Sequence, residues 1–427
     1  MTKQHDEENQ GKRTKTAHGP AVREEKRRKW QVKQERQNHQ NKRKRVEDHQ
    51  DPVSSWCQEN AGFATLVTEE DIDSIRNENK DGDQKGERSD RHEDLALHLA
   101  PFWDVQDLAT DTANQVLTPT KTAANTKRLF IAEGTETVRI LLQQQRQRLN
   151  STSSAVELEL APIELKSIFV KPSVLLDEPV RLVTDVQAAM VDTISNGNAG
   201  VIKCNTMNDH QPKFHVLVGR SESVLSQVAG FPVKRGALAC GVCPTDRTEA
   251  WLNDYISHKL SSSTDPLRIL ALDGICDTAN LGSMIRTASV LGINVVVVSN
   301  NTCDVWYRRT IRVSMGHVFL VPVVRVQNLA IFLEKWKQTA VDRSLTSFAA
   351  VVQKDDDTVT LERMGSSSVP SAWCCVMGNE GNGISEKVID VCTKRLRIDM
   401  TDGVDSLSVP IATGILLHGL REREKRD

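Results

Sequence analysis

The chain has 427 residues, which allows two or three domains at roughly 150 residues per domain. Hydrophobic residues make up 38% of it and the mean hydropathy is −0.41, a polar balance that predicts a disordered segment beside folded ones. Because the net charge is only −2, the whole chain is no polycation, and any affinity for nucleic acid has to come from local basic patches. The apolar runs fall short of the ~18 residues of a membrane helix, and the charged N-terminus has no secretory pattern.

The nine cysteines are an odd number, and several lie inside apolar runs, which predicts free thiols in a reducing compartment. Cys240 and Cys243 form a CxxC pair without the second pair that a structural metal site needs. We interpret this pair as structural and expect the protein to bind no metal.

Residues 1–95 are predicted to form a disordered charged arm, because residues 1–50 in particular have almost no apolar side chains to bury. Basic clusters at 26–29 and 42–45 leave three interpretations open: a solvated tail, a non-specific RNA-binding arm and a nuclear import signal. Acidic residues within the arm argue against a mitochondrial transit peptide. We therefore expect an intracellular protein of the nucleus or cytoplasm rather than of a mitochondrion or plastid. Residues 96–126 are predicted to be a linker with a short docking element.

Ordered structure is predicted to begin near residue 127. Short apolar strands and helical segments follow one another up to residue 245, a pattern typical of a small α/β layer. The expected strands are 129–132, 167–170, 215–218 and 235–242, and residues 221–228 are expected to form a helix. Residues 246–265 are predicted to be a linker.

Residues 266–424 alternate regularly between strand and helix patterns. Strands such as 294–298 are apolar on both faces, which predicts a parallel sheet covered by helices on both sides. The expected strands are 268–272, 294–298, 317–321, 347–352, 372–377 and 395–398. The expected helices are 281–291, 305–314, 328–337, 385–392 and 407–424.

The glycine pattern of this region argues against two common nucleotide-binding folds. A dinucleotide-binding fold has a GxGxxG loop after its first strand, but residues 277–282 contain a single glycine, Gly282. The sequence also has no Walker loop. The glycine-rich loop follows a late strand instead and runs from Gly378 to Gly383, so a dehydrogenase or NTPase function is poorly supported.

Three segments of this region, read in order, resemble the SpoU family of RNA 2'-O-ribose methyltransferases in the SPOUT superfamily. They are LDGICDTANLGSMIRTA (272–288), VMGNEGNGIS (376–385) and RIDMTDGVDSLSVPIATGILL (397–417). Residues 127–245 are similar to the substrate-binding domain that many SpoU enzymes carry, a small α/β RNA binder like a ribosomal protein. The resemblance rests there on RLFIAEGTETVRILL, SIFVKPSVL and VLSQVAGFPVKRGALACGV; a generic α/β accessory domain is the alternative.

The resemblance implies a trefoil-knotted parallel-sheet catalytic domain, an exception to the usual absence of knots. It implies S-adenosylmethionine as the cofactor, held in the knot by Gly378, Ile398, Met400 and Leu407. The implied reaction methylates a ribose 2'-oxygen of structured RNA, with rRNA ahead of tRNA as the substrate. The family usually dimerises through the knot, so we expect a homodimer.

The catalytic candidates implied by the resemblance are Asn280, Arg286, Glu380, Ser406 and Ser408. Arg286 matches the family's invariant arginine, for which two roles stay open: clamping the target phosphate and accepting the hydroxyl proton. Asn280 is expected to cap a helix or to orient the guanidinium, and Glu380 to bind Arg286 or Asn280. Ser406 and Ser408 are expected to begin the last helix. Each of these residues, taken singly, has an ordinary structural interpretation as a cap, a solvated loop residue or a salt-bridge partner.

Ser408 departs from the family pattern, which usually has Asn there, and a serine reaches less far than an asparagine. The alternative hypothesis is therefore an RNA-binding or ribosome-assembly factor of the same fold with weak or lost catalysis.

The segment 305–314 is predicted to be a basic helix with two aromatic side chains. Arg308, Arg309 and Arg312 are candidate phosphate contacts, and Tyr307 is a candidate for stacking on a base. An ordinary surface helix with core-facing Ile311 explains the same pattern equally well. Related SpoU proteins carry a similar arginine-rich stretch ending in SMG, which favours RNA contact.

Overall fold

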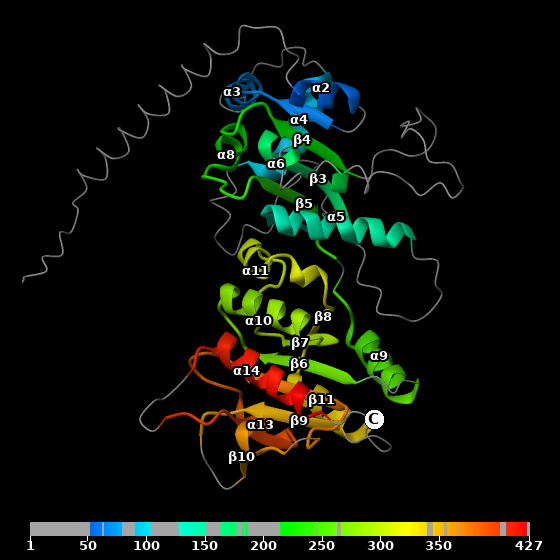
Figure 1. Ribbon diagram of the computed structural model, residues 1–427, viewed down its shortest axis with the longest axis vertical. Helices are drawn as coiled ribbons and strands as arrows, with labels where there is room; N and C mark the ends of the chain where they lie inside the picture. Colours follow the sequence, from blue (N-terminus) through cyan, green and yellow to red (C-terminus); the bar gives the residue numbers. More distant parts are fainter. Residues whose placement is uncertain are drawn as a thin grey trace, which may run out of the picture. The chain divides into compact units, whose positions relative to one another are not determined.

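The computed structural model describes most of the chain after residue 51. The described residues are 52–61, 64–78, 90–103, 128–150, 163–176, 182, 184–186, 214–244, 246–262, 266–339, 345–353, 357–365, 367–401 and 407–424. They form two β-sheets with helices around them (Figure 1). None of the helices in these ranges is both long enough and apolar enough to cross a membrane.

The first sheet has five strands in the order β1-β4-β3-β5-β2. They are β1 Ala64–Val67, β2 Leu129–Glu133, β3 Glu164–Val170, β4 His215–Gly219 and β5 Ala237–Val242. The strands β1, β4 and β3 are mutually parallel, whereas β5 runs antiparallel to both β3 and β2. The helices of this part are α2 Pro52–Glu59, α3 Glu69–Glu78, α4 Asp90–Leu99, α5 Thr135–Asn150, α6 Pro172–Leu176 and α8 Val224–Ala229.

The prediction of disorder over residues 1–95 is wrong for part of that stretch. The strand β1 pairs with β4 along its whole length, and Ile72 and Ile75 of α3 are buried against the sheet. Val53 and Trp56 of α2 are also buried. A few well-spaced apolar residues are enough to fold these short elements, although the average composition is polar. Residues 1–51, with both basic clusters, lie outside the described residues. The linker predicted for residues 96–126 begins with ordered structure, because α4 continues to Leu99.

The second sheet confirms the predicted parallel α/β architecture. Its seven strands are all parallel and have the order β10-β12-β9-β11-β6-β7-β8. The strands are β6 Leu267–Asp273, β7 Val295–Ser299, β8 Val323–Val326, β9 Leu345–Ala350, β10 Thr358–Thr360, β11 Ala372–Gly378 and β12 Lys394–Arg397. The helices are α9 Glu249–Ser262, α10 Thr278–Val290, α11 Arg308–Val313, α12 Leu329–Thr339, α13 Glu386–Val391 and α14 Val409–Glu422.

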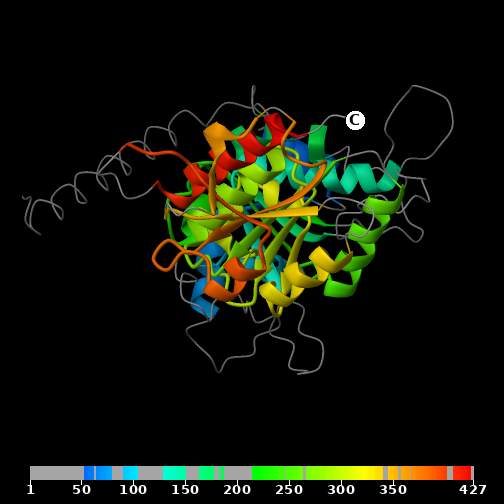
Figure 2. The same ribbon diagram turned by 90° about the horizontal axis from the view of Figure 1, so that it is seen from below.

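Alternate residues of the central strands enter two different cores, as expected of a sheet with both faces covered. Leu270 and Leu272 of β6 pack with α10, α11 and α14, whereas Ile269 and Ala271 pack with α9, α12 and α13. Figure 2 shows the same division, with the red α14 on one side of the strands and the yellow α12 and orange α13 on the other. The predicted linker 246–265 therefore contains a helix, α9, that covers one face of the sheet.

The strand predicted at 317–321 is wrong. Residues His317–Phe319 form a 3-10 helix, η3, and the strand β8 begins only at Val323. Gly316 turns the chain with a φ of 84°, and Pro322, directly before the edge strand β8, has no N–H to donate to a neighbouring strand. Val318 and Phe319 are buried without belonging to a strand, so their apolar pattern reflects burial alone. The three-residue β10 was not predicted.

The last helix is held to the second sheet by a buried ion pair. Arg268 of β6 donates from Nε and Nη2 to the two carboxylate oxygens of Glu424, at 2.8 and 3.1 Å. Trp373 Nε1 of β11 donates to the same carboxylate at 3.0 Å, and Glu424 is 6% exposed. A buried carboxylate is stable only when its oxygens are satisfied, and here all three donors are side-chain groups of two neighbouring central strands, β6 and β11.

Replacing Glu424 by Ala should lower the free energy of unfolding by about 3 kcal/mol, because it leaves the Arg268 guanidinium and the indole N–H without their acceptor. Urea unfolding followed by circular dichroism measures this change. Glu422→Ala is the matched control, since Glu422 is the exposed last residue of α14, two positions before Glu424, and its effect should stay within about 0.5 kcal/mol. Equal effects of the two substitutions would contradict the stabilising role of the Arg268–Glu424 ion pair.

Candidate active site

Each of the three segments singled out in the sequence contains the C-terminal end of a strand, and these strand ends lie at the same edge of the second sheet. Asp273 is the last residue of β6 and pairs with Gly378, the last residue of β11. The strand β12 is separated from β11 only by β9, and the pairing register puts Arg397 at the level of Gly378. Because all these strands are parallel, the loops that follow them lie along one edge, the usual position of ligand sites in α/β sheets.

The glycine-rich loop folds back tightly on the end of β11. The backbone N–H and C=O groups of Asn379 and Gly383 form two reciprocal hydrogen bonds, at 3.0 and 2.9 Å. A Cβ at position 378 would lie 2.2 Å from both the carbonyl carbon of Gly383 and the nitrogen of Ile384. Gly383 itself has a φ of 71°, which favours glycine. The loop therefore needs glycine at 378 for space and at 383 for backbone conformation.

Asn379 connects this loop to the loop that follows β6. Its Nδ2 donates to the carbonyl oxygen of Gly274 at 2.8 Å, and its Oδ1 accepts from the N–H groups of Gly381 and Asn382 at 2.8 and 3.2 Å. The loop is held from its other end by Ser385, whose N–H and hydroxyl donate to the buried carboxylate of Asp273 at 2.9 and 2.8 Å. The two loops thus form one hydrogen-bonded unit.

Helix α10 begins beside this unit and brings Asn280 to the glycine-rich loop. Asn280 Nδ2 donates to Glu380 Oε1 at 2.6 Å, across 100 positions of sequence. Of the two partners predicted for Glu380, the structure therefore shows Asn280. The capping role considered for Asn280 is wrong, because the carboxylate of Asp277 caps the helix by accepting from the N–H groups of Ala279 and Asn280.

Arg286 lies on the same helix, six residues after Asn280, with an exposed side chain. His317 of η3 is a neighbour that the sequence did not indicate, and its Nδ1 lies 3.1 Å from Ser289 Oγ of α10. Burial lowers the pKa of His317 below its ordinary value of 6.5, and the positive charge of Arg286 lowers this pKa further. The imidazole is therefore neutral at pH 7 and does not place a second positive charge beside the guanidinium.

The third segment contributes residues of different exposure. Ile398 is partly buried against the core, Met400 is half-buried and Leu407 is 38% exposed. Ser408 is the N-cap residue of α14, and its carbonyl oxygen accepts from Ile411 and Ala412, but its side chain makes no capping bond. Ser406 lies outside the described residues. The placement of Ser408 agrees with its predicted position at the start of the last helix, although α14 begins at Val409, two residues after the predicted start at Leu407.

Two of the three candidate RNA-binding arginines contact the first sheet. Arg308 and Arg312 of α11 donate to Glu133 Oε2 of β2, at 3.0 and 3.4 Å, and Glu133 is 2% exposed. The guanidinium of Arg308 also lies 4.9 Å from the ring centroid of Phe231. Arg309 is exposed, and so is Arg312 despite its contact with Glu133. The first two arginines therefore neutralise a buried carboxylate, and RNA contact remains a prediction for all three.

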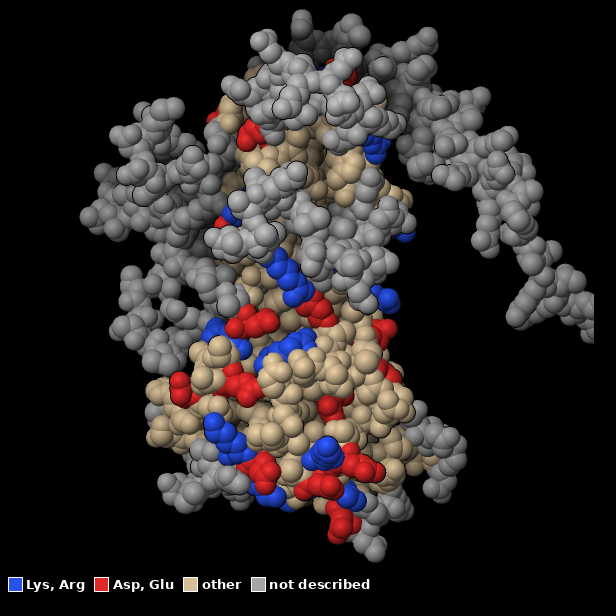
Figure 3. All heavy atoms as spheres, turned by 180° about the vertical axis from the view of Figure 1, so that it is seen from behind, with Lys and Arg blue, Asp and Glu red and all other residues tan. Residues whose placement is uncertain are grey.

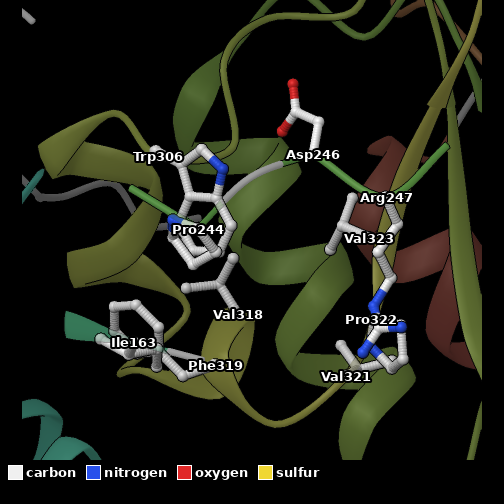
Figure 4. A pocket seen from close by; sticks show the side chains of 10 residues that line it. All are labelled: Ile163, Pro244, Asp246, Arg247, Trp306, Val318, Phe319, Val321, Pro322 and Val323. Carbon is white, nitrogen blue, oxygen red and sulfur yellow. The ribbon is translucent and has the colours of Figure 1, made fainter. Parts of the chain in front are cut away.

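A small cavity elsewhere in the structure does not have the size of a cofactor site. It has a volume of about 30 Å³ and is lined by Asp246, Arg247, Trp306, Phe319 and neighbouring apolar residues (Figure 4). A volume of this order holds one or two water molecules. The described residues also contain no cluster of three or more metal-binding side chains.

Several residues of this site carry local signals that sequence reasoning did not use. Asp277 directly precedes a helical pattern, as N-cap residues do. Asn379 precedes Glu-Gly, and asparagine side chains often accept from backbone N–H groups two or three residues ahead in turns. The contact of His317 with α10 has no local signal, because it depends on how η3 packs.

Comparison with known proteins places this geometry in a family. Residues 267–418 match the family model described as "SpoU rRNA Methylase family". The chain is 31% identical over 183 residues to the 23S rRNA (guanosine-2'-O-)-methyltransferase RlmB of Pseudomonas aeruginosa, a match that covers 43% of this chain and 70% of that protein. It is 29% identical over 154 residues to the 23S rRNA (guanosine(2553)-2'-O)-methyltransferase RlmP of Bacillus subtilis, covering 36% of this chain and 58% of that protein.

A solved structure of a methyltransferase has a similar fold. The crystal structure of an AdoMet-bound rRNA methyltransferase from Sinorhizobium meliloti superposes with a TM-score of 0.51 at 18% identity, covering 84% of this chain and 97% of that one. The site therefore belongs to a methyltransferase fold with a parallel sheet. The chain belongs to the SpoU rRNA methylase family, which confirms the family and the enzyme class predicted from the sequence.

Replacing Asn379 by Ala should loosen the glycine-rich loop without unfolding the protein, because the hydrogen bonds of its side chain to Gly274, Gly381 and Asn382 and its contact with a sulfur are lost. At about 1 kcal/mol net per hydrogen bond, the amides of Gly381 and Asn382 should exchange about 10–100 times faster. Amide hydrogen exchange followed by mass spectrometry measures this rate. Asn382→Ala is the matched control, since only the backbone N–H of Asn382 takes part in the loop bonds described here. Unchanged exchange in Asn379→Ala would contradict the assigned role.

Proposed function

We propose that the protein transfers the methyl group of S-adenosylmethionine to a ribose 2'-oxygen of structured RNA, with rRNA as the preferred substrate class. The observation that carries this proposal is the contact between Asn280 and Glu380, which joins α10 to the glycine-rich loop at the carboxyl edge of the sheet. It brings two separate family segments together, and Arg286 projects from the same helix. The rRNA methyltransferase names of the relatives support the substrate class.

The residues at this edge fit the cofactor that the family implies. The backbone of residues 381–383 is exposed, and the loop has its own hydrogen bonds already satisfied by Asn379, so it is rigid before any ligand arrives. Partly exposed apolar side chains at Ile398, Met400 and Leu407 follow in the third segment. We infer that Gly378 and these three residues form the cofactor site. When bound there, S-adenosylmethionine would supply a methyl group on a positively charged sulfur.

The chain's own groups provide orientation and charge. The exposed Arg286 guanidinium can bind a phosphate of the RNA through two parallel hydrogen bonds, which fixes the position of the neighbouring ribose. Asn280 and Glu380 hold the loop against α10, so that the RNA site and the cofactor site keep a constant separation. The proton of the 2'-hydroxyl has to leave as the oxygen–methyl bond forms. Acceptance of this proton by Arg286 remains the second hypothesis for that residue.

The alternative, an RNA-binding or assembly factor without catalysis, rests on Ser408. This residue is the N-cap of α14 with a side chain free of capping bonds, so its hydroxyl is available to a ligand. Its shorter reach favours a lower rate rather than loss of activity, because the chain keeps Asn280, Arg286 and Glu380. The enzyme is therefore the better supported of the two proposals.

We propose that RNA binds through local groups rather than through one continuous basic surface. On the face seen in Figure 3, Lys and Arg side chains are interspersed with Asp and Glu among the described residues, in keeping with the small net charge. Arg309 is an exposed arginine of α11, whereas Arg308 and Arg312 contact Glu133, so Arg309 is the one that we expect to contact a phosphate directly. Tyr307 is the neighbouring candidate for stacking on a base.

We also propose that the protein is a homodimer, formed through α10 and α14 close to the segment whose passage through a knot the family implies. Four apolar side chains of this region are exposed: Val290 at 64%, Ile411 at 57%, and Leu407 and Ile415 at 38% each. Ile411 and Ile415 are four residues apart and share one face of α14. An apolar face of this kind is typical of a subunit interface, and a second copy is the occupant that the family predicts.

Replacing Arg286 by Ala should lower kcat/KM for methyl transfer by about 10²–10³-fold, the usual cost of losing a charged group that orients a reacting substrate. Transfer from methyl-labelled S-adenosylmethionine to rRNA, followed by mapping of 2'-O-methyl sites, measures this change. Arg286→Lys should keep part of the activity if the residue clamps a phosphate. The control is Arg421→Ala, an exposed arginine at the end of α14. The proposal fails if wild-type protein labels no ribose or if Arg286→Ala is as active as wild type.

Replacing Ile411 by Asp should convert the dimer to a monomer, because a carboxylate would then be buried in an apolar interface. Light scattering coupled to size-exclusion chromatography should give twice the chain mass of 47.6 kDa for wild type and a single chain mass for the variant. Ile331→Asp is the matched control, since Ile331 is 64% exposed on α12, which covers the opposite face of the sheet. A monomeric wild-type protein would overturn the proposal.

A further inference from the structure

Two cysteines lie side by side next to the glycine-rich loop. Cys276 belongs to the loop that follows β6, and Cys303 to the loop that follows β7. The backbone N–H of Cys303 donates to the carbonyl oxygen of Ile275 at 2.8 Å, and this carbonyl directly precedes Cys276. The two cysteines therefore lie on neighbouring, hydrogen-bonded loop segments, close enough for the charge of Cys276 to act on the pKa of Cys303. A disulfide bridges Cα atoms that are roughly 4.4–6.8 Å apart, a distance that residues on adjacent hydrogen-bonded segments can reach.

The two thiols differ in access to solvent. Cys276 is the exposed cysteine among the free cysteines of the described residues, whereas Cys303 is half-buried. The pKa of Cys303 is raised to about 11, mainly by burial. The neighbouring Cys276, Asp277 and Glu380 add to this rise, and the positive charge of Arg325 opposes it. Cys303 is therefore a protonated thiol at neutral pH, and an oxidant from solvent meets Cys276 first.

Cys276 is also in contact with the loop that organises the site. Its Sγ donates to the carbonyl oxygen of Gly274 at 3.2 Å and accepts from Nδ2 of Asn379 at 3.5 Å. The same Nδ2 holds Gly274, so the sulfur is part of the junction between the two loops. A change in the position of this sulfur acts directly on Asn379.

We propose that Cys276 and Cys303 form a reversible oxidation site that reacts with hydrogen peroxide and closes to a disulfide. In the first step the Cys276 sulfur attacks the peroxide O–O bond, giving a sulfenic acid and one molecule of water. In the second step the Cys303 sulfur attacks the sulfenic sulfur, the S–S bond forms, and the hydroxyl group leaves with the Cys303 proton as a second water. The peroxide accepts the two electrons that the thiols lose. A thiol reductant reverses the reaction by exchange.

The consequence for activity rests on the proposed function. Formation of the disulfide moves the Cys276 sulfur from Asn379 towards Cys303, which removes one contact of the junction between the two loops. We expect the oxidised protein to bind S-adenosylmethionine more weakly, with recovery on reduction.

The test is differential alkylation and peptide mass spectrometry of the full chain after treatment with hydrogen peroxide. A linked Cys276–Cys303 peptide should form in about tenfold excess over any other cysteine pairing, and it should disappear after treatment with dithiothreitol. In Cys303→Ser, Cys276 should instead accumulate as sulfenic acid, trapped by dimedone. Cys243→Ser, at the CxxC pair, is the matched control and should oxidise like wild type.

Dimedone labelling of Cys276 in wild type at the level of Cys303→Ser would overturn the proposal, and so would pairing of Cys276 with another cysteine. These readouts do not depend on methyl transfer. If the disulfide forms in a protein that methylates no RNA, the oxidation site stands and the proposed function fails. If methyl transfer occurs and no disulfide forms, the proposed function stands and the oxidation site fails.

Discussion

The close approach of two backbone segments at Gly378 is the constraint on which the site depends. The chain leaves the sheet at this residue, turns through four positions and returns so closely that a Cβ at 378 would lie 2.2 Å from the backbone of Gly383 and Ile384. No side chain can be accommodated there without moving the loop. The tight return fixes the direction of the loop and brings Glu380 to Asn280 on a helix that begins 100 residues earlier.

The polar contacts around this turn explain why it can be rigid at an exposed edge. Asn379 satisfies the loop amides and joins them to the carbonyl of Gly274, while the buried Asp273 holds the far end through Ser385. Each of these bonds is worth only about 1 kcal/mol, but they share the same few residues, so they act together. A preformed loop of this kind loses less conformational entropy when it binds a ligand, which suits a site whose role is to orient two substrates.

Much of the fold and of the candidate site could be predicted from the sequence, and the predictions that were wrong failed for physical reasons. The parallel sheet was predictable because runs such as that of β7 are apolar on both faces, and the ordered set of Asn280, Arg286 and Glu380 pointed to the correct family. The strand predicted at 317–321 failed because apolar periodicity reports burial and not strand pairing. The folded elements between Pro52 and Leu99 were missed because composition averages hide a few well-placed apolar residues. The sulfur contact of Cys276 and the proximity of His317 to Arg286 depend on tertiary packing, for which local sequence holds no signal.

The most direct test of the account is the dissociation constant of S-adenosylmethionine for Gly378→Ala, measured by calorimetry beside wild type. Gly365→Ala is the matched control, because a Cβ at 365 would meet nothing within 4 Å. The account predicts that Gly378→Ala stays folded by circular dichroism and binds about 100-fold more weakly or not at all, while Gly365→Ala binds like wild type. Wild-type affinity in a folded Gly378→Ala protein would contradict the claim that the close backbone return at this residue builds the site.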